Sequence, residues 1–373
     1  ILLEHLKSLG LAMDLRAGDR YFFYSSTSWM AWNYLVSGLL HHATIVLYEG
    51  SPAFPDATGS WCVAEQTRAT TFGMGAAYVT ASEKAGIRLG DEVDLSALRT
   101  VIPTGSPLPA GGWRWLHDQL GSGVRIDPIA GGTDVCTAFV GGSPLLPVRV
   151  GRIPCRWPGI AVDVLDEGGT PVRGRVGEFV VTRPMPSMPV GLWNDPSGQR
   201  YRETYFTRFP GIWRQGDWAR LEDEGSLMIV GRSDSTLNRA GVRVGSAEIY
   251  AVVEQQAEIL DSLVVGLELP DGGYYMPLFV VLADGAVLDE KLARRLRHAI
   301  REQLSPRHVP DEILAAPAIP RTLTGKKLEL PVKRILQGAP VEQAVALGAV
   351  SGPEALEWFA TLPGPVGGDG SGP

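Results

Sequence analysis

The sequence is poor in cysteine, in net positive charge and in long apolar runs. Cys62, Cys136 and Cys155 are the only cysteines among 373 residues, so the chain shows neither a disulfide framework nor paired zinc spacing. This scarcity favours a reducing compartment, and we expect a cytoplasmic protein. The formal charge of −7 argues against a nucleic-acid partner, because such proteins carry a basic balance or a basic patch.

A stretch without Asp, Glu, Lys or Arg, from Tyr21 to Tyr48, needs a check for a membrane span. A spanning helix needs about 20 predominantly apolar residues. Serine, threonine, asparagine and histidine interrupt this stretch, so we expect a buried helix between two core strands and no membrane span. The N-terminus lacks both a signal pattern and an initiator Met, and it begins inside a predicted helix. We therefore expect a piece of a longer protein.

The order of periodic segments predicts an α/β fold. Strand-like runs alternate with helical ones up to about residue 120, which favours a largely parallel sheet. Short strands separated by turns predict a β-rich subdomain over 145–232. From Gly231 onward the pattern is α+β, with a helix capped by Ser246 and an amphipathic helix over 289–304. We expect a large domain over 1–233, a small mobile domain over 234–338 and a partly disordered extension over 339–373.

Several familiar motifs fail on inspection. The segment Gly73–Tyr78 imitates a dinucleotide fingerprint, but Tyr78 stands where close packing needs Gly or Ala, which disfavours an oxidoreductase. The segment Thr324–Lys327 lacks the upstream Gly of a phosphate loop. The six histidines show no metal-ligand spacing, so we expect structural or solvent roles for them.

Four segments could carry chemistry. Each alone is more often an ordinary turn, hairpin or solvated loop. A Gly pair followed by a hydroxyl and a carboxylate could approach phosphate and Mg²⁺, and an acid directly after Gly could accept both hydroxyls of a ribose. A long segment between the β-rich and α+β regions suits a hinge, and a small-residue loop presents a lysine. These segments are Gly131–Asp134, Trp213–Asp217, Gly231–Ile249 and Pro320–Lys326.

Together and in this order, the four segments resemble the adenylate-forming superfamily of acyl-CoA synthetases, luciferases and peptide-synthetase adenylation domains. The likeness runs from about Ile1 to Leu336, and it is greatest to the acetoacetyl-CoA synthetases. Ser28–Asn33, Pro186–Asp195 and Leu304–Pro310 support that likeness. The resemblance implies activation of acetoacetate with ATP, Mg²⁺ and CoA, through an acyl-adenylate, with release of AMP and pyrophosphate.

The resemblance also implies roles for single residues. Catalysis would fall to Lys326, which bridges the acid and the α-phosphate, to Thr133 on that phosphate, and to Asp134 on Mg²⁺. The nucleotide would contact Gly105, Ser106, Pro107, Asp217, Arg232 and Arg243. Asp234 would be the hinge, and Gly241 would line the tunnel for the CoA thiol.

The acyl pocket would be formed by Gly131, Gly132 and Trp29. Related acetate-activating enzymes carry a bulky Trp at the place of Gly131, so Gly here would leave room for a longer acid. One of Ser25, Ser26, Thr27 and Ser28 would donate a hydrogen bond to the ketone of acetoacetate.

One departure from the superfamily leaves alternatives open. The Ser/Thr/Gly-rich phosphate loop, which lies upstream of the segment that matches Ile1, is absent. The chain is therefore either a fragment of a normal ligase or a truncated, non-catalytic nucleotide-binding module. A ligase for another short acid and an adenylation domain that loads a carrier protein are further alternatives.

Overall fold

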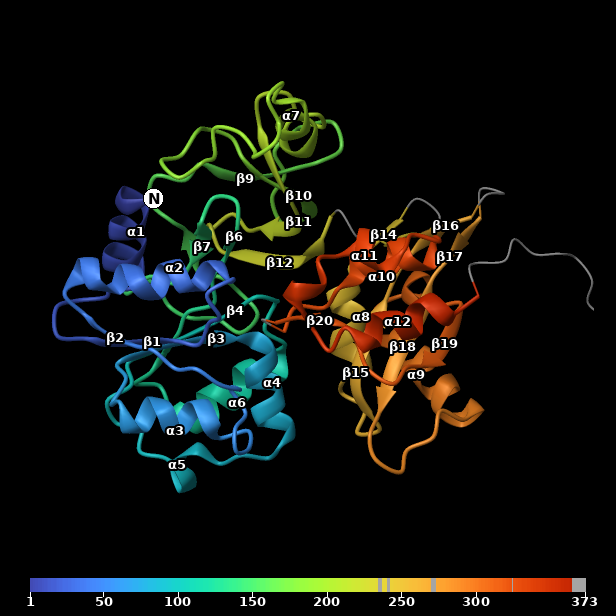
Figure 1. Cartoon of the computed structure of the whole chain (residues 1–373), viewed down its shortest axis with the longest axis horizontal. Coiled ribbons are helices and arrows are strands. Elements are labelled where there is room, and N and C mark those ends of the chain that lie inside the picture. The colour runs from blue at the N-terminus through green and yellow to red at the C-terminus, as the bar shows by residue number, and fades with distance from the viewer. Residues whose placement is uncertain (234–236, 240–241, 270–272, 324, 364–373) are drawn as a thin grey trace, which may run out of the picture. The chain divides into compact units, whose positions relative to one another are not determined.

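The computed structural model describes residues 1–233, 237–239, 242–269, 273–323 and 325–363. The chain divides into two compact units, Ile1–Ile229 and Val230–Pro373. Figure 1 traces them from blue to red along the sequence. The predicted domain boundary at 233/234 lies four residues beyond this division and stays a prediction.

The first unit is built on a parallel five-stranded sheet with the order β2-β1-β3-β4-β5. Its strands are β1 (Arg20–Phe23), β2 (Thr44–Val46), β3 (Thr71–Gly75), β4 (Thr100–Thr104) and β5 (Arg125–Ile126). Side chains alternate along β1: Tyr21 and Phe23 enter one apolar core, and Phe22 enters another. The sheet is therefore buried on both faces, as parallel sheets usually are.

Helices cover the two faces of this sheet (Figure 1). Residues of α2 (Met30–Ser37) pack into the core that contains Tyr21 and Phe23. The opposite core takes residues from α3 (Gly59–Gln66), α4 (Ala76–Lys84) and α6 (Ala110–Leu120). The short helices α1 (Leu2–Lys7) and α5 (Leu89–Glu92) complete this part.

Two antiparallel sheets follow the parallel sheet. The four-stranded one lies within the predicted β-rich region 145–232, whereas β6 and β7 of the three-stranded one precede that region. The three-stranded sheet consists of β6 (Ala130–Gly132), β7 (Thr137–Gly141) and β8 (Cys155–Arg156). The four-stranded sheet has the order β12-β11-β10-β9, with β9 (Val162–Leu165), β10 (Val176–Val181), β11 (Trp213–Leu221) and β12 (Leu227–Arg232). Between β10 and β11 the chain forms α7 (Gln199–Tyr205).

The second unit has the expected α+β character. Strand β18 (Pro277–Leu282) pairs antiparallel with β15 (Ile259–Val264) and parallel with β19 (Glu312–Ala315). One face of this sheet packs against α8 (Ser246–Val253) and α9 (Glu290–Gln303), and the other against α10 (Glu329–Leu336) and α12 (Glu354–Thr361). The smaller elements are β13 (Leu237–Arg239), β14 (Val242–Val244), β16 (Leu267–Glu268), β17 (Tyr274–Tyr275), β20 (Arg321–Thr322), β21 (Val350–Ser351) and α11 (Val341–Ala344).

One local expectation differs from this structure. Ser246 is the first residue of α8 rather than its cap; Gly245 occupies the cap position. The described part of the predicted extension packs onto the second unit, because Leu356 and Phe359 of α12 are fully buried in its core. The partial disorder expected for 339–373 stays a prediction. Within the described residues, no helix combines the length and apolarity that crossing a membrane requires.

Candidate active site

The turn between β6 and β7 presents Thr133 and Asp134 to solvent. Its closure depends on Cys136, which has a left-handed φ of 50° and donates its N–H to the carbonyl of Thr133 at 3.0 Å. Both Thr133 and Asp134 are exposed, although Val135 and Thr137 on either side of Cys136 are buried. The turn therefore holds a hydroxyl and a carboxylate out of the sheet, as a phosphate site would require.

Gly131 lies close to the backbone of β7. A Cβ built on Gly131 would lie 2.1 Å from the carbonyl oxygen of Thr137 and 2.4 Å from Cα of Ala138. Backbone atoms cannot move aside as a side chain can, so the strand pairing itself requires Gly here. The role of Gly131 in the acyl pocket stays a prediction.

A buried polar network, formed mainly by residues of α1, holds the start of β7 in place. His5 shares hydrogen bonds with the Cys136 carbonyl and the Ser37 hydroxyl, both at 2.7 Å. The Thr137 hydroxyl donates to Glu4 at 3.0 Å, and Lys7 lies 2.5 Å from the same carboxylate oxygen. Burial lowers the pKa of His5, so the imidazole is neutral near pH 7. His5 therefore has the structural role expected of it, supporting the turn that carries Thr133 and Asp134.

A second contact system joins this turn to β11. The phenol of Tyr205 donates to Oδ2 of Asp134 at 2.5 Å, and its ring stacks on Trp213 with a centroid separation of 3.6 Å. The indole N–H of Trp213 donates to Oε1 of Gln215 at 3.1 Å. A Cβ on Gly132 would lie 2.9 Å from Nε2 of Gln215, so the Gln215 side chain lies against the Gly pair. The motifs 131–134 and 213–217 therefore lie side by side.

Tyr205 was not among the residues predicted from the sequence. Burial and the neighbouring Asp134 carboxylate raise the pKa of its phenol, which stays a donor at neutral pH. The available signal was the run of aromatic residues before the Gly-Asp pair: Tyr201, Tyr205, Phe206 and Trp213 form one cluster of ring contacts.

Asp217 lies in an irregular part of β11. Strand β10 pairs Glu178 with Trp218 and Val180 with Arg214, so three residues of β11 oppose the single Phe179. Gly216, at the centre of this bulge, has a φ of 83°. Bulges re-aim side chains next to functional sites, and Asp217 follows the glycine directly. Asp217 is half-buried.

Two further predicted segments meet at the carboxyl end of the parallel sheet. The turn Gly105–Pro107 follows β4 directly and is exposed, with a φ of 86° at Gly105. A Cβ on Gly105 would lie 3.8 Å from the indole of Trp29, which packs edge-on against Phe23 at the end of β1. The hydroxyl of Thr104 donates to the carbonyl of Ile129 at 3.0 Å, which ties this turn to the chain entering β6.

The proposed hydroxyl donors for the ketone lie in the same loop as Trp29. The Ser25 hydroxyl donates to the carbonyl of Ser26 at 3.0 Å, and the hydroxyls of Ser26 and Ser28 are 3.0 Å apart. The choice among these residues stays a prediction.

In the second unit, Lys326 belongs to a tight hairpin. Its N–H donates to the Thr322 hydroxyl at 3.0 Å, its carbonyl accepts from the Thr322 N–H at 2.8 Å, and its side chain is exposed. Arg232 ends β12 and is half-buried. Arg243 pairs with Asn238 across the β13–β14 hairpin. Asp234 and Gly241, the predicted hinge and tunnel residues, lie outside the described residues.

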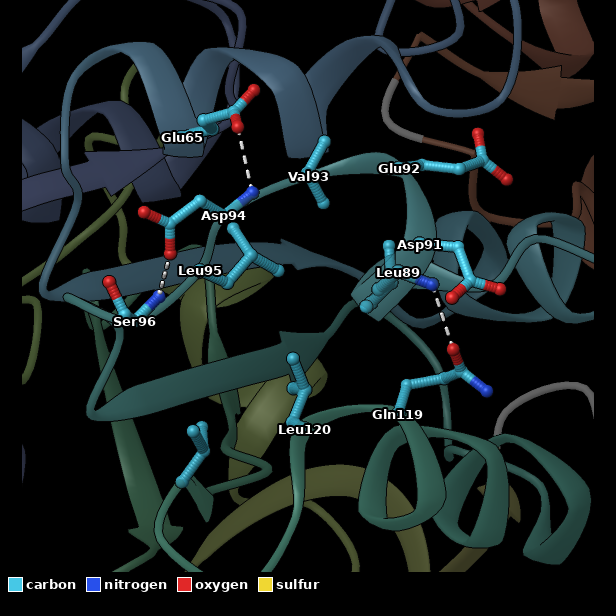
Figure 2. A pocket seen from close by; sticks show the side chains of 12 residues that line it. Glu65, Leu89, Asp91, Glu92, Val93, Asp94, Leu95, Ser96, Gln119 and Leu120 are labelled. Atoms are coloured by element: carbon cyan, nitrogen blue, oxygen red, sulfur yellow. Dashed lines mark hydrogen bonds between the residues drawn. The ribbon is translucent and has the colours of Figure 1, made fainter.

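A pocket of about 600 Å³ lies elsewhere in the first unit (Figure 2). None of the motif residues line it. Glu65 accepts the N–H of Asp94 at 2.7 Å, and Gln119 accepts the N–H of Leu89 at 2.8 Å, so these polar groups secure a loop. This pocket is therefore separate from the residues of the candidate site.

The residues present fit a cation that is shared with a phosphate ligand. In the part of the chain that the structure describes, no cluster of three His, Cys, Asp or Glu side chains could hold a metal alone. Asp134 offers one exposed carboxylate, and Mg²⁺ commonly takes one or two carboxylates together with substrate phosphates.

Comparison with known proteins identifies relatives of the whole chain. The model of the AMP-binding enzymes matches residues 3–189, and that of the AMP-binding enzyme C-terminal domain matches residues 248–326. The chain is 45% identical to acetoacetyl-coenzyme A synthetase of Rhizobium meliloti (strain 1021), over 97% of its own length and 55% of that protein. It is 39% identical to acetoacetyl-CoA synthetase of Gallus gallus, over 97% of its length and 54% of the relative.

Solved structures of related enzymes also match this chain. Acetoacetyl-CoA synthetase from Streptomyces lividans superposes with a TM-score of 0.88 at 53% identity, over 96% of this chain and 55% of that one. The anthranilate CoA ligase AuaEII, 21% identical with a TM-score of 0.74, shares the fold. The chain spans about half the length of the acetoacetyl-CoA synthetases that it matches.

Proposed function

The chain belongs to the AMP-binding enzymes, and on that basis we propose that it forms the catalytic part of an acid–thiol ligase for acetoacetate. The observation that carries the proposal is the meeting of three predicted segments in one unit: Gly105–Pro107, Gly131–Asp134 and Gln215–Asp217. The 45% identity to an acetoacetyl-CoA synthetase over 97% of the chain supports the choice of acid.

The proposed reaction has two steps. A carboxylate oxygen of acetoacetate attacks the α-phosphorus of ATP, and the bond to pyrophosphate breaks. The CoA thiol then loses its proton and attacks the acyl carbon, and AMP leaves. The first step brings two anions together, so positive charge near the developing negative charge lowers its barrier.

The residues of the first unit would bind the nucleotide. The turn Gly105–Pro107 would contact adenine, Asp217 would accept the ribose hydroxyls, and Thr133 would donate to the α-phosphate. Asp134 would hold Mg²⁺, which when bound neutralises phosphate charge.

The resemblance also gives roles to residues of the second unit. Lys326 would bridge the acid and the α-phosphate, Arg232 and Arg243 would contact the nucleotide, Asp234 would be the hinge, and Gly241 would line the thiol tunnel. The scarcity and wide spacing of its three cysteines are the ground on which we also propose a reducing compartment, the cytoplasm.

The test is acid-dependent ATP–pyrophosphate exchange with acetoacetate, acetate and butyrate in parallel. We expect exchange with acetoacetate alone. Exchange with another short acid would support the alternative ligase. If the chain binds ATP but shows no exchange, the assay is repeated with the upstream segment of a relative supplied. A continued lack of exchange would support the non-catalytic module.

Lys326→Ala separates the two half-reactions. We expect it to lose adenylation but to keep thioester formation from a supplied acyl-adenylate. Equal loss of both half-reactions would contradict the role of Lys326.

A further inference from the structure

Tyr205 is the last residue of α7, and its side chain contacts the exposed turn after β6. Its phenol reaches Oδ2 of Asp134 at 2.5 Å, although the two residues are 71 positions apart in the sequence. The residue is 7% exposed, so the hydroxyl lies at the inner edge of the turn rather than in solvent.

Three aromatic rings hold Tyr205 in place. Trp213 stacks on it with an interplanar angle of 14°, and Tyr201 and Phe206 meet it edge-on at 5.5 and 6.4 Å between centroids. A ring confined in this way keeps its hydroxyl at one position, because rotation would break the stack with Trp213.

The carboxylate of Asp134 depends on this hydroxyl for its orientation. Asp134 is exposed on a turn, and Tyr205 is its hydrogen-bond partner among the described residues. A carboxylate offers two oxygens with about four acceptor sites, so the bond to Oδ2 leaves Oδ1 available for a ligand. Without the phenol, the exposed side chain would be free to change rotamer.

We propose that Tyr205 is a positioning residue that fixes the Asp134 carboxylate for a divalent cation bound to the phosphates of the nucleotide. The inference rests on the proposed function and adds a residue to it. Tyr205 does not touch the cation; it acts through Asp134, as outer partners of metal ligands do.

The first test measures binding of Mn²⁺ to this chain in the presence of ATP, with the relaxation rate of water protons as the signal. Tyr205→Phe removes the hydroxyl and keeps the stacked ring. We expect its apparent affinity for Mn²⁺ to fall about tenfold, the lower end of the range for outer partners. Unfolding temperature and tryptophan fluorescence should stay close to those of the unchanged chain.

Tyr201→Phe is the matched control. Tyr201 belongs to the same helix and the same ring cluster, but its hydroxyl donates to the carbonyl of Pro189. We expect this variant to bind Mn²⁺ as the unchanged chain does. Equal losses in the two variants, or no loss in Tyr205→Phe, would overturn the inference and leave the proposed function standing.

A second measurement is independent of nucleotide. The ¹³Cγ resonance of Asp134, assigned with Asp134→Asn, should move in Tyr205→Phe and stay in place in Tyr201→Phe. An unmoved resonance would overturn the inference. If the unchanged chain binds no Mn²⁺ with ATP, even with the upstream segment of a relative supplied, the proposed function fails and the cation role of Tyr205 fails with it.

Discussion

The ammonium group of Lys327 lies 3.8 Å from the centre of the Tyr250 ring, and this contact anchors the hairpin that carries Lys326. The same ammonium is 2.5 Å from Glu254 and 2.9 Å from Asp261. Arg321, at the other end of the hairpin, pairs with both oxygens of Asp261 at 2.7 Å. One lysine of the adjacent pair is therefore held inside the unit while its neighbour is exposed.

The two lysines should respond differently to substitution. Lys327→Met would leave Glu254 without its cation, and breaking an ion pair of this partly buried kind costs up to about 3 kcal/mol. We expect urea unfolding to show this loss in the free energy of unfolding. Asp261 keeps its pair with Arg321 in the variant and should add little to the loss. Lys326→Ala should change the free energy of unfolding by less than about 0.5 kcal/mol, because its side chain is exposed. Similar stability losses in both variants would contradict this division of roles.

The two glycines of the motif should also differ. Gly131→Ala would place its methyl group 2.1 Å from the Thr137 carbonyl oxygen, so β6 and β7 must separate. We expect a loss of about 3 kcal/mol, the upper end for overpacking. The atoms nearest to a Cβ on Gly132 belong to the end of the Gln215 side chain, which can shift, so we expect a loss below about 1 kcal/mol for Gly132→Ala. Urea unfolding of the two variants measures the difference, and a larger loss in Gly132→Ala would refute the explanation.

The sequence predicted the fold class, but not the contacts between the segments of the candidate site. Periodicity in 289–304 anticipated α9, where Leu292, Leu296 and Ile300 are buried and Asp289 caps the helix by accepting the Leu292 N–H. Spacing along the chain cannot show that Tyr205 reaches Asp134, because that bond depends on how α7 packs against β11. The fixed position of Lys327 likewise follows from its contacts with Tyr250, Glu254 and Asp261, which lie far from it in the sequence.

Asp127 gives a prediction for the pH dependence of stability. Burial raises the pKa of its carboxyl to about 6, although Arg125 beside it lowers the pKa. Oδ1 of Asp127 has no hydrogen-bond partner among the described residues. Between pH 4 and 6 the folded chain therefore binds more protons at this site than the unfolded chain does. The stability contribution of Asp127 is greatest below pH 4 and is lost as pH rises through 6.

Asp127→Asn removes this titration. The free energy of unfolding of the variant minus that of the unchanged chain should rise by up to about 3 kcal/mol from pH 4 to pH 7, since one pKa unit is worth about 1.4 kcal/mol. Thermal unfolding across this range measures it. Asp94→Asn is the control. Hydrogen bonds from Ser96 lower the pKa of Asp94, so the difference for this variant should stay constant from pH 7 down to about pH 4 and change only at lower pH. A difference for Asp127→Asn that does not depend on pH would refute the assignment.

The first turns of the chain have their polar side chains inside and their leucines outside. Glu4 and His5 are fully buried, whereas Leu2, Leu3 and Leu11 are each about 65% exposed. Exposed apolar surface of this kind marks an interaction site or an aggregation liability, so we expect the isolated chain to self-associate as its concentration rises. Size-exclusion chromatography with light scattering would detect this, and Leu3→Ser combined with Leu11→Ser should shift the equilibrium toward monomer. Leu260→Ser, at a 51% exposed position of β15, should leave association unchanged. A chain that stays monomeric and unfolds cooperatively at all concentrations would contradict the prediction that these exposed leucines drive self-association.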